Sequence, residues 1–377
     1  MKVLPRKGTG AVKFDGLKNK FGISNDNVIP LWIADMDIAI AREIVDAITN
    51  FLQANIVGYV DIDITEAVCL WHQSKGEALE REWITSLSSV LMGIRTAITT
   101  FTQIDDKIML LSPVYSPFYS LISQCGRTIH EIPLVPTNSG FAIDIEKLNP
   151  DAKMLLLCNP NNPTGSVWPE TDLQSLVSFC VKHNILVIAD EVHSDFIFNQ
   201  RSFKSVLALG EHAQNITIVL NSCAKSFNLA AIPGAAYAII PNSGLRGAFH
   251  QRISSVHGEA GALSCVALNA AYRHGEPWLA KVKAWLRENR AMVANCFRSS
   301  PKGLQVHIGD ATYFAWLDFT ALDKTHYQIE TALLAAGVAL TSGKEYGAPC
   351  CFRMNLATSP SLLEAASKRI TRMAQKI

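Results

Sequence analysis

Short apolar runs, each about the length of one buried strand, recur through the middle of the chain. The runs are KIMLLS, KMLLLC, ILVIA, ITIVL and AYAII, at residues 107–112, 153–158, 185–189, 216–220 and 236–240. Segments with helical spacing separate several of them, for example ETDLQSLVSFCVKHN at 170–184. Strands that alternate with helices favour a mostly parallel sheet with helices on both faces. The pattern therefore predicts an α/β fold.

The two ends of the chain differ from this central pattern. Residues 41–54 have helical spacing, and a long polar helix follows residue 277. After that helix come TYFAWLDF and a final helix, which are typical of an α+β unit. Because 377 residues exceed what one core usually serves, we predict two domains. The large domain spans 41–276, and the small domain combines 1–40 with 277–377.

Composition narrows the classes of partner. Apolar residues make up 49% of the chain and charged residues 18%, which is typical of a globular protein. Lys and Arg number 34 against 33 acidic residues, so the net charge is +1. No basic stripe stands out along the sequence. We therefore expect neither nucleic acid nor a membrane surface as a partner.

The nine cysteines are scattered, and no Cys-x-x-Cys motif occurs. This usage indicates neither a disulfide framework nor a zinc site, and we expect no metal. The start, MKVLPRKGTGAVKF, lacks the apolar core of a signal peptide. No apolar run approaches the roughly 18 residues of a membrane span. We expect a soluble cytoplasmic protein.

Three polar motifs directly follow three of the apolar runs. NPNNPTG contains Asn162, DEVH begins with Asp190, and NSCAK ends with Lys225. In open α/β sheets, ligands bind beyond the carboxyl ends of the strands. If these strands are parallel and near neighbours, the three side chains converge on one crevice.

Each motif also has an ordinary structural explanation. Asn, Pro and Gly form turns, an Asp after a strand often caps a helix, and a lone lysine is usually solvated. His193 alone is compatible with a structural histidine. The SCAK segment matches the Ser-x-x-Lys signature of serine β-lactamases, but the partner tripeptides Ser-Asp-Asn and Lys-Thr-Gly are absent. The joint pattern favours a catalytic site over these separate explanations.

The chemistry that uses this set is that of pyridoxal 5'-phosphate (PLP). A lysine amine forms a Schiff base with the cofactor aldehyde, and an acid opposite the pyridine nitrogen keeps that nitrogen protonated. Lys225 and Asp190 suit these two roles. Asn162 and His193 are candidates to hydrogen-bond the hydroxyl of the ring.

The phosphate requires backbone N–H groups at the start of a helix. The segment SLSSVLMGIRTAITTF, at 86–101, offers such a start near Ser89 and Val90. Ser222 offers an additional hydroxyl. Tyr115, in SPVYSPF, is a candidate to stack on the cofactor ring, although core packing also explains it.

Over nearly its whole length the chain resembles the fold-type I, aspartate-aminotransferase-like PLP enzymes. The separations of Asn162, Asp190, Lys225 and Arg353 are similar to those of that superfamily. IPLWIADMD, VGYVD, LLCNPNNPTGSVW, IADEVHSDFIF and ATYFAWLDF resemble the cystathionine β-lyase or C–S lyase group of MalY/PatB type. The resemblance implies a seven-stranded, mostly parallel sheet between helices, with a smaller α+β domain. It also implies that Arg353 grips the α-carboxylate of the substrate.

The implied activity is α,β-elimination from cystathionine or another S-substituted cysteine, or its sulfoxide, with release of a thiol-type fragment, pyruvate and ammonia. Trp32 is expected at the substrate, and Tyr59 is expected to reach the active site of the neighbouring subunit in a homodimer. Many aminotransferases of this superfamily have a phosphate-binding arginine at the position of Pro233, and its absence favours the lyase group. The alternatives are an aminotransferase of an amino acid and, third, a PLP-bound regulatory protein. The sequence does not identify the substrate side chain.

Overall fold

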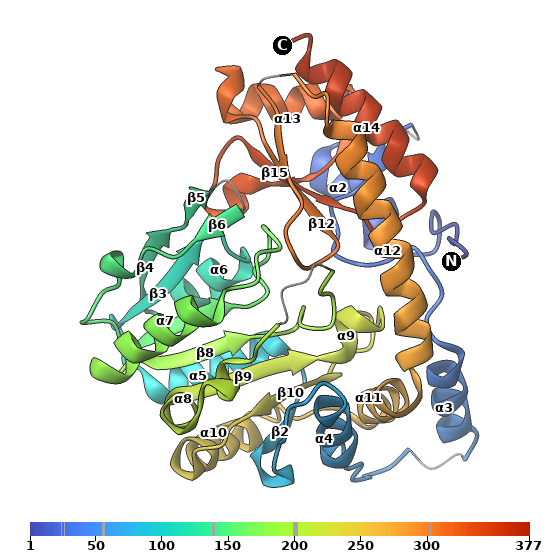
Figure 1. Ribbon diagram of the computed structural model, residues 1–377. Coiled ribbons are helices and arrows are strands. Elements are labelled where there is room, and N and C mark those ends of the chain that lie inside the picture. The colour runs from blue at the N-terminus through green and yellow to red at the C-terminus, as the bar shows by residue number, and fades with distance from the viewer. Residues whose placement is uncertain (24, 26, 55–56, 138–139, 199–202, 302) are drawn as a thin grey trace.

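A seven-stranded sheet forms the centre of the molecule (Figure 1). The computed structural model describes residues 1–377 except 24, 26, 55–56, 138–139, 199–202 and 302. The strand order is β2-β10-β9-β8-β7-β3-β4. Only β10 runs antiparallel to its neighbours, so the predicted mostly parallel sheet is confirmed. The strands are β2 (Ile84–Leu87), β3 (Lys107–Ser112), β4 (Thr128–Pro133), β7 (Met154–Cys158), β8 (Leu186–Asp190), β9 (Thr217–Ser222) and β10 (Ala236–Ile239).

Helices cover both faces of this sheet. Successive strand residues point to opposite faces, so an apolar run that is buried throughout packs on both sides. One face is covered by α5 (Val90–Phe101), α6 (Pro117–Gln124) and α10 (Ser243–Ser255). The other face is covered by α4 (Thr65–Gln73), α7 (Glu170–Lys182), α8 (Glu211–Ile216) and α11 (Ala262–His274), with α3 (Arg42–Gln53) against α11.

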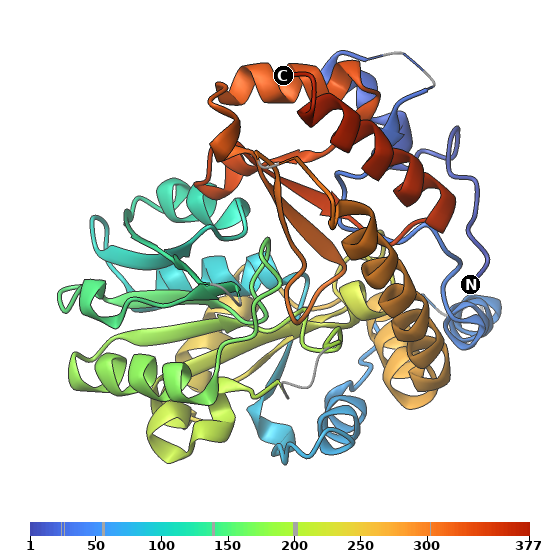
Figure 2. The same ribbon diagram turned by 45° about the horizontal axis from the view of Figure 1, so that its top comes forward.

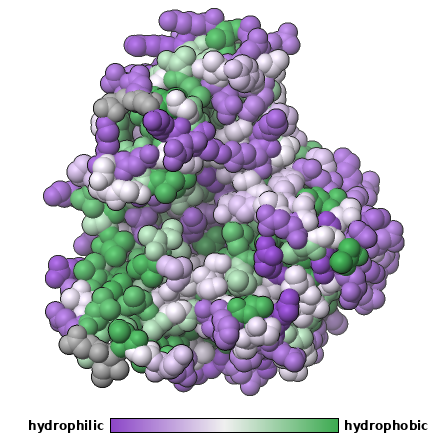
Figure 3. All heavy atoms as spheres, turned by 180° about the vertical axis from the view of Figure 1, so that it is seen from behind, coloured by the Kyte–Doolittle hydropathy of each residue, from purple (hydrophilic) through white to green (hydrophobic). Residues whose placement is uncertain are grey.

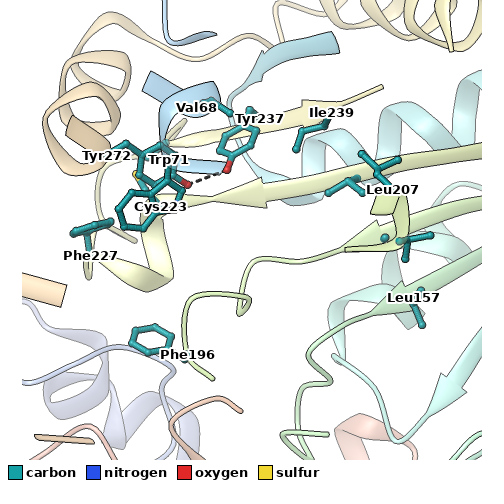
Figure 4. Packing of buried hydrophobic residues seen from close by; sticks show 14 of the residues in the cluster. Val68, Trp71, Leu157, Phe196, Leu207, Cys223, Phe227, Tyr237, Ile239 and Tyr272 are labelled. Atoms are coloured by element: carbon teal, nitrogen blue, oxygen red, sulfur yellow. Dashed lines mark hydrogen bonds between the residues drawn. The ribbon is translucent and has the colours of Figure 1, made fainter. Parts of the chain in front are cut away.

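The core of the second face packs against a short helix, α9 (Cys223–Ser226), which directly follows β9. Trp71 stacks on Tyr272 with ring centroids 4.8 Å apart, and the Tyr237 hydroxyl lies 3.0 Å from that of Tyr272 (Figure 4). Cys223 and Phe227, at either end of α9, are both fully buried in this cluster. Dense aromatic packing therefore fixes the helix at the end of β9.

A second, four-stranded sheet forms the upper part of the molecule in Figures 1 and 2. Its strands are antiparallel in the order β11-β12-β15-β14. The strands are β11 (Gln305–His307), β12 (Phe314–Asp318), β14 (Thr341–Ser342) and β15 (Cys351–Asn355). Its core includes residues of α12 (Glu276–Phe297), α13 (His326–Ala335) and α14 (Pro360–Ala374).

The N-terminal segment lies against this upper part. β1 (Ile29–Pro30) pairs in parallel with β13 (Val338–Ala339), so a segment near the start of the chain lies beside one from its C-terminal part. Two short helices precede β1, namely α1 (Val12–Asp15) and α2 (Leu17–Phe21). The exact domain boundaries stay a prediction.

The remaining described elements are short. β5 (Val135–Thr137) and β6 (Gly140–Ala142) form a two-stranded antiparallel pair. The 3-10 helices are η1 (Arg81–Trp83), η2 (Ile145–Lys147), η3 (Val206–Leu209), η4 (Thr320–Leu322) and η5 (Gly343–Tyr346). Among the described residues, no helix combines the length and the apolar character that crossing a membrane requires.

Candidate active site

The carboxyl ends of β7, β8 and β9 meet at one edge of the large sheet. The three strands are parallel neighbours, so the residues that follow them lie close together. Asn162 lies in the loop after β7, Asp190 ends β8, and Lys225 belongs to α9 after β9. All three line one cavity of about 760 Å³. Strand order alone thus brings together groups that are far apart in sequence.

The Lys225 amine lies in an environment that disfavours its charged form. Its Nζ donates a hydrogen bond to the Ala34 carbonyl oxygen at 3.0 Å. Burial, and then the nearby Arg353 guanidinium, lower the pKa of Lys225 to about 8, although Asp35 and Asp190 oppose this shift. An amine with this pKa is available as a nucleophile or base near neutral pH.

Asp190 is a buried carboxylate with few partners. Its Oδ1 accepts a hydrogen bond from the Val192 N–H at 3.1 Å. Burial raises the pKa of Asp190 to about 6, and the Val192 hydrogen bond and Lys225 only partly offset this effect. A cationic group placed beside Asp190 would compensate the buried charge.

His193 is buried three residues after Asp190, in the loop that follows β8. Its Nδ1 has no hydrogen-bond partner among the described residues, and its ring packs edge-on against Phe314 at 5.6 Å. Burial, with Lys225 and Arg353, holds the pKa of His193 well below its usual range. A neutral imidazole with an unused nitrogen at a cavity wall is available to a ligand.

Arg353, in β15, brings the small sheet into the site. Its Nη1 donates to Asn162 Oδ1 at 2.8 Å, and its Nη2 donates to the Trp32 carbonyl at 3.1 Å. The guanidinium lies 4.3 Å from the centre of the Phe314 ring and 5.3 Å from that of Tyr346. Its Nε is buried without a partner among the described residues. The planar fork is therefore held at the cavity wall by its neighbours.

The start of α5 also lines the cavity. Ser89 caps this helix, and its hydroxyl accepts from the Met92 N–H at 3.0 Å. The first N–H groups of a helix have no acceptor within the helix, and together with its dipole they favour an anion. Ser89 and Val90 line the cavity, as the sequence predicts for a phosphate site.

Ser222 also lines the cavity, but its hydroxyl already has backbone partners. It accepts from the Ala224 N–H at 3.0 Å and donates to the Ala235 carbonyl at 2.5 Å. These contacts cap α9, which carries Lys225. The structure therefore gives Ser222 a structural contact in addition to its predicted place near the phosphate.

The three aromatic residues predicted for the site differ in position. Tyr115 lines the cavity and packs edge-on against Phe118 at 5.5 Å. Trp32 lines it as well, with its indole N–H donating to the Lys13 carbonyl at 2.9 Å. Tyr59 is fully exposed and does not line the cavity of its own chain.

The N-terminal segment contributes residues to which sequence reasoning assigned no role. Arg6, Lys20 and Asp35 line the cavity, and so does Glu345 of η5. Asp35 and Asp37 occur in the IPLWIADMD motif, so the sequence could have indicated these two carboxylates. It could not have indicated their basic partners, because those lie in a segment with no clear periodicity.

The donor set around the cavity fits PLP. It combines a poorly solvated amine at Lys225, a buried carboxylate at Asp190 that is only partly compensated, a His193 nitrogen without a partner among the described residues, and the N–H groups of a helix start. These groups complement an aldehyde, a pyridine nitrogen, a ring hydroxyl and a phosphate. Within the described part of the chain, no group of three or more His, Cys, Asp or Glu side chains is arranged to hold a metal ion.

Comparisons with known proteins agree with this picture. The family model for aminotransferase class I and II matches residues 28–370. The chain is 30% identical to cystathionine β-lyase PatB of Bacillus subtilis over 97% of each sequence. It is 30% identical to protein MalY of Escherichia coli, over 92% of this chain and 90% of MalY. The PLP-bound C–S lyase of Staphylococcus hominis, crystallised with the inhibitor L-cycloserine, is 25% identical, with a TM-score of 0.90 over 99% of this chain and 97% of that one.

Proposed function

The chain belongs to the aminotransferase class I and II family, and from this premise we propose that it is a PLP-dependent C–S β-lyase. Its substrate is cystathionine or another S-substituted cysteine, and its products are a thiol, pyruvate and ammonia. The convergence of Lys225, Asp190 and Arg353 on one cavity carries the proposal. The relatives named cystathionine β-lyase and C–S lyase support elimination as the reaction.

The residues that line the cavity would hold the cofactor. Lys225 would be its covalent attachment point, and the Asp190 carboxylate would pair with the pyridine nitrogen. Asn162 and His193 would hydrogen-bond the ring hydroxyl, and Tyr115 would stack on the ring. The N–H groups at Ser89 and Val90 would bind the phosphate, with a contribution from Ser222. Bound PLP supplies an electron sink for the negative charge that develops at Cα.

The protein side chains orient the substrate and move its protons. Arg353 binds the α-carboxylate through its planar fork, with Trp32 beside it, and so fixes the direction of the Cα–H bond. The Lys225 amine takes the Cα proton, and the Cβ–S bond then breaks with its electron pair leaving on sulfur. The thiolate takes up a proton to give the thiol. Water then hydrolyses the remaining three-carbon enamine to pyruvate and ammonia. Over the whole reaction, the substrate and water give the thiol, pyruvate and ammonia.

The direct test is pyruvate release by the purified PLP-loaded protein, without a keto-acid acceptor, from cystathionine and a panel of S-substituted cysteines. Sustained release over many turnovers is the expected result. Amino transfer that depends on an added keto acid, with no pyruvate from any panel member, would replace elimination with transamination.

We also infer a homodimer with shared active sites. Tyr59 is fully exposed, and Leu52, Val57, Val60 and Leu263 are large apolar side chains that are each at least 39% exposed. Figure 3 shows apolar residues gathered on the lower part of the molecule, as seen from behind. Exposed apolar surface of this kind favours association with another protein surface. In the dimer, Tyr59 reaches the cavity of the partner and contacts the phosphate end.

Mixed dimers test this arrangement. In a hybrid dimer, Lys225→Ala removes the base from one site, and Tyr59→Ala in the partner subunit removes the donated side chain from that same site. If sites are shared, mixing the two variants after partial unfolding restores one intact site per hybrid dimer, and activity returns. No recovery in a sample whose hybrid dimers are verified by mass would contradict the sharing of Tyr59.

We place the protein in the cytoplasm. All nine cysteines are free, and several are fully buried. Free thiols of this number persist in a reducing compartment. Cell fractionation that recovers the protein with cytoplasmic markers is the expected result.

A further inference from the structure

An isolated ion pair lies at the mouth of the active-site cavity. Lys20 of α2 and Glu345 of η5 both line the cavity, and their Nζ and Oε1 atoms are 2.7 Å apart. Their side chains are 40% and 38% exposed. An ion pair this exposed contributes little stability, about 0–1 kcal/mol, so a ligand can exchange with either partner at low cost.

A second set of charges near the mouth differs in this respect. Arg6, Lys13, Asp35 and Asp37, here called the buried charge cluster, pair with one another at distances between 2.7 and 3.1 Å. Lys13 is fully buried and Asp37 is 1% exposed. In contrast, the only ion-pair partner of Lys20 among the described residues is Glu345, and the reverse also holds. The mouth therefore has one pair of opposite charges that is free to be exchanged.

This pair is connected to the carboxylate-binding group through two aromatic residues. Phe21 follows Lys20 and packs edge-on against Trp32 at 5.4 Å, and the Trp32 carbonyl accepts from Arg353. Tyr346 follows Glu345, and its ring lies 5.3 Å from the Arg353 guanidinium. A substrate held by Arg353 thus has the pair within the same cavity.

The cavity also has apolar wall residues. Val12, Ile33, Ala231 and Ile232 line it, as do Lys20 and Glu345. A thioether sulfur and its methylene groups would bury apolar surface along such walls. A charged end group would be better placed at the exposed mouth, where it remains partly hydrated.

We propose that Lys20 and Glu345 form a subsite for the leaving fragment, and that this fragment ends in a dipolar head with one carboxylate and one ammonium group. The inference rests on the proposed lyase function and specifies its substrate class. The carboxylate of the head pairs with Lys20 and its ammonium group with Glu345. A short S-alkyl group reaches neither partner.

Four thioethers test the carboxylate and the ammonium group of the leaving fragment separately. Cystathionine carries both groups, S-(2-carboxyethyl)cysteine only the carboxylate, S-(2-aminoethyl)cysteine only the ammonium group, and S-ethylcysteine neither. Lys20→Met should lower kcat/KM for the carboxylate substrate relative to S-ethylcysteine by about three- to tenfold and shift the ammonium substrate in the opposite direction. Glu345→Gln should show the reverse pattern. Each variant should lower the preference for cystathionine. The matched control is Lys368→Met with Glu364→Gln, an exposed ion pair on α14 that does not line the cavity.

Binding is measured separately from turnover by titrating the absorbance of the PLP-loaded protein with each thioether. Charge-selective changes in Kd support the subsite even if a given thioether is not cleaved. Equal effects of both variants on all four thioethers, in Kd and in kcat/KM, would overturn the subsite and leave the lyase function intact. Absence of pyruvate from every thioether would overturn the lyase function, while the Kd values still decide on the subsite.

Discussion

Two regions line the same cavity but are built on different principles. At the edge of the large sheet, Asp190 and His193 are buried together with Arg353 of the small sheet, and all three are incompletely paired. Among the described residues, Asp190 has no directly bound cation, and His193 Nδ1 and Arg353 Nε have no hydrogen-bond partner. In the N-terminal segment, the two bases and two acids of the buried charge cluster pair with one another. Buried charges without a directly bound counter-charge cost stability and are available to a ligand. The charges of the cluster offset one another and hold the chain in place, even though Asp35 Oδ1 and Asp37 Oδ2 accept no hydrogen bond among the described residues.

This difference separates residues that react from residues that support them. The Ala34 carbonyl, which accepts from Lys225 Nζ, lies next to Asp35 of the cluster. The Trp32 carbonyl, which accepts from Arg353, lies two residues earlier. The cluster thus fixes a backbone segment that contacts both the predicted base and the predicted carboxylate-binding group. Substitutions in the two regions should therefore have different signatures.

The largest effect is expected for Lys225→Ala. Loss of both covalent attachment and proton transfer should lower kcat by at least about 10³-fold. Reduction of the PLP-loaded protein with borohydride, followed by peptide mass spectrometry, should place the modification on residue 225 and remove it in the variant. The matched control is Lys281→Ala, an exposed lysine on α12. Substantial turnover in Lys225→Ala would refute its role.

The buried charge cluster should respond in stability. Lys13→Met removes one of the two cations that lie 2.9 Å from Asp37 Oδ1 and leaves Arg6 as the other, so unfolding in urea should require about 1.5–3 kcal/mol less free energy. The matched control is Lys20→Met, whose partner is exposed and whose loss should change stability by no more than about 1 kcal/mol. Similar losses in the two variants would erase the distinction between the cluster and the mouth pair.

Arg353→Lys should weaken substrate binding and so raise KM, an effect that a loss of stability would not by itself produce. Lysine cannot reproduce a bidentate fork, and the loss of one hydrogen bond to a charged group, about 1.5–3 kcal/mol, predicts a roughly 10- to 100-fold lower kcat/KM. Comparison of an S-substituted cysteine with its methyl ester identifies the cause. The preference for the free carboxylate should fall in the variant; an unchanged preference would place the carboxylate elsewhere.

The sequence predicted the sheet edge far better than the N-terminal segment, for a physical reason. β7, β8 and β9 are buried on both faces, so their apolar runs are visible, and the next polar residue marks the edge where ligands bind. Asn162, Asp190 and Lys225 followed from that rule together with the choice of chemistry. Lys13, by contrast, lies in a four-residue helix, and its burial depends on partners 22 and 24 residues away. No local pattern reveals such a contact.

Asp190→Asn tests the idea that the sheet edge is built for a ligand at a cost in stability. The ordinary pKa of an aspartate is 3.8, and in the folded protein burial raises the pKa of Asp190 to about 6. The folded state then binds more protons than the unfolded state between these values, so its stability falls as pH rises through this window and stays low above it. Asp190→Asn should therefore stabilise the cofactor-free protein by about 1–3 kcal/mol at pH 7, with little difference near pH 4.

The neighbouring Asp195 supplies a control of opposite sign. Burial acts to raise its pKa, but Lys75 and Ser226 outweigh that effect and lower it. Its contribution to stability is present above the ordinary pKa and disappears as pH falls, so Asp195→Asn should destabilise at pH 7 and less so in acid. Urea unfolding of both variants from pH 4 to pH 8 checks this contrast. The effect of Asp190→Asn should grow as pH rises, whereas the effect of Asp195→Asn should stay nearly constant, because its pH window lies below the ordinary pKa of 3.8. If Asp190→Asn also destabilised the cofactor-free protein at pH 7, Asp190 would be a satisfied structural carboxylate like Asp195. The distinction between ligand-binding and supporting residues would then not hold for Asp190, the residue on which it mainly rests.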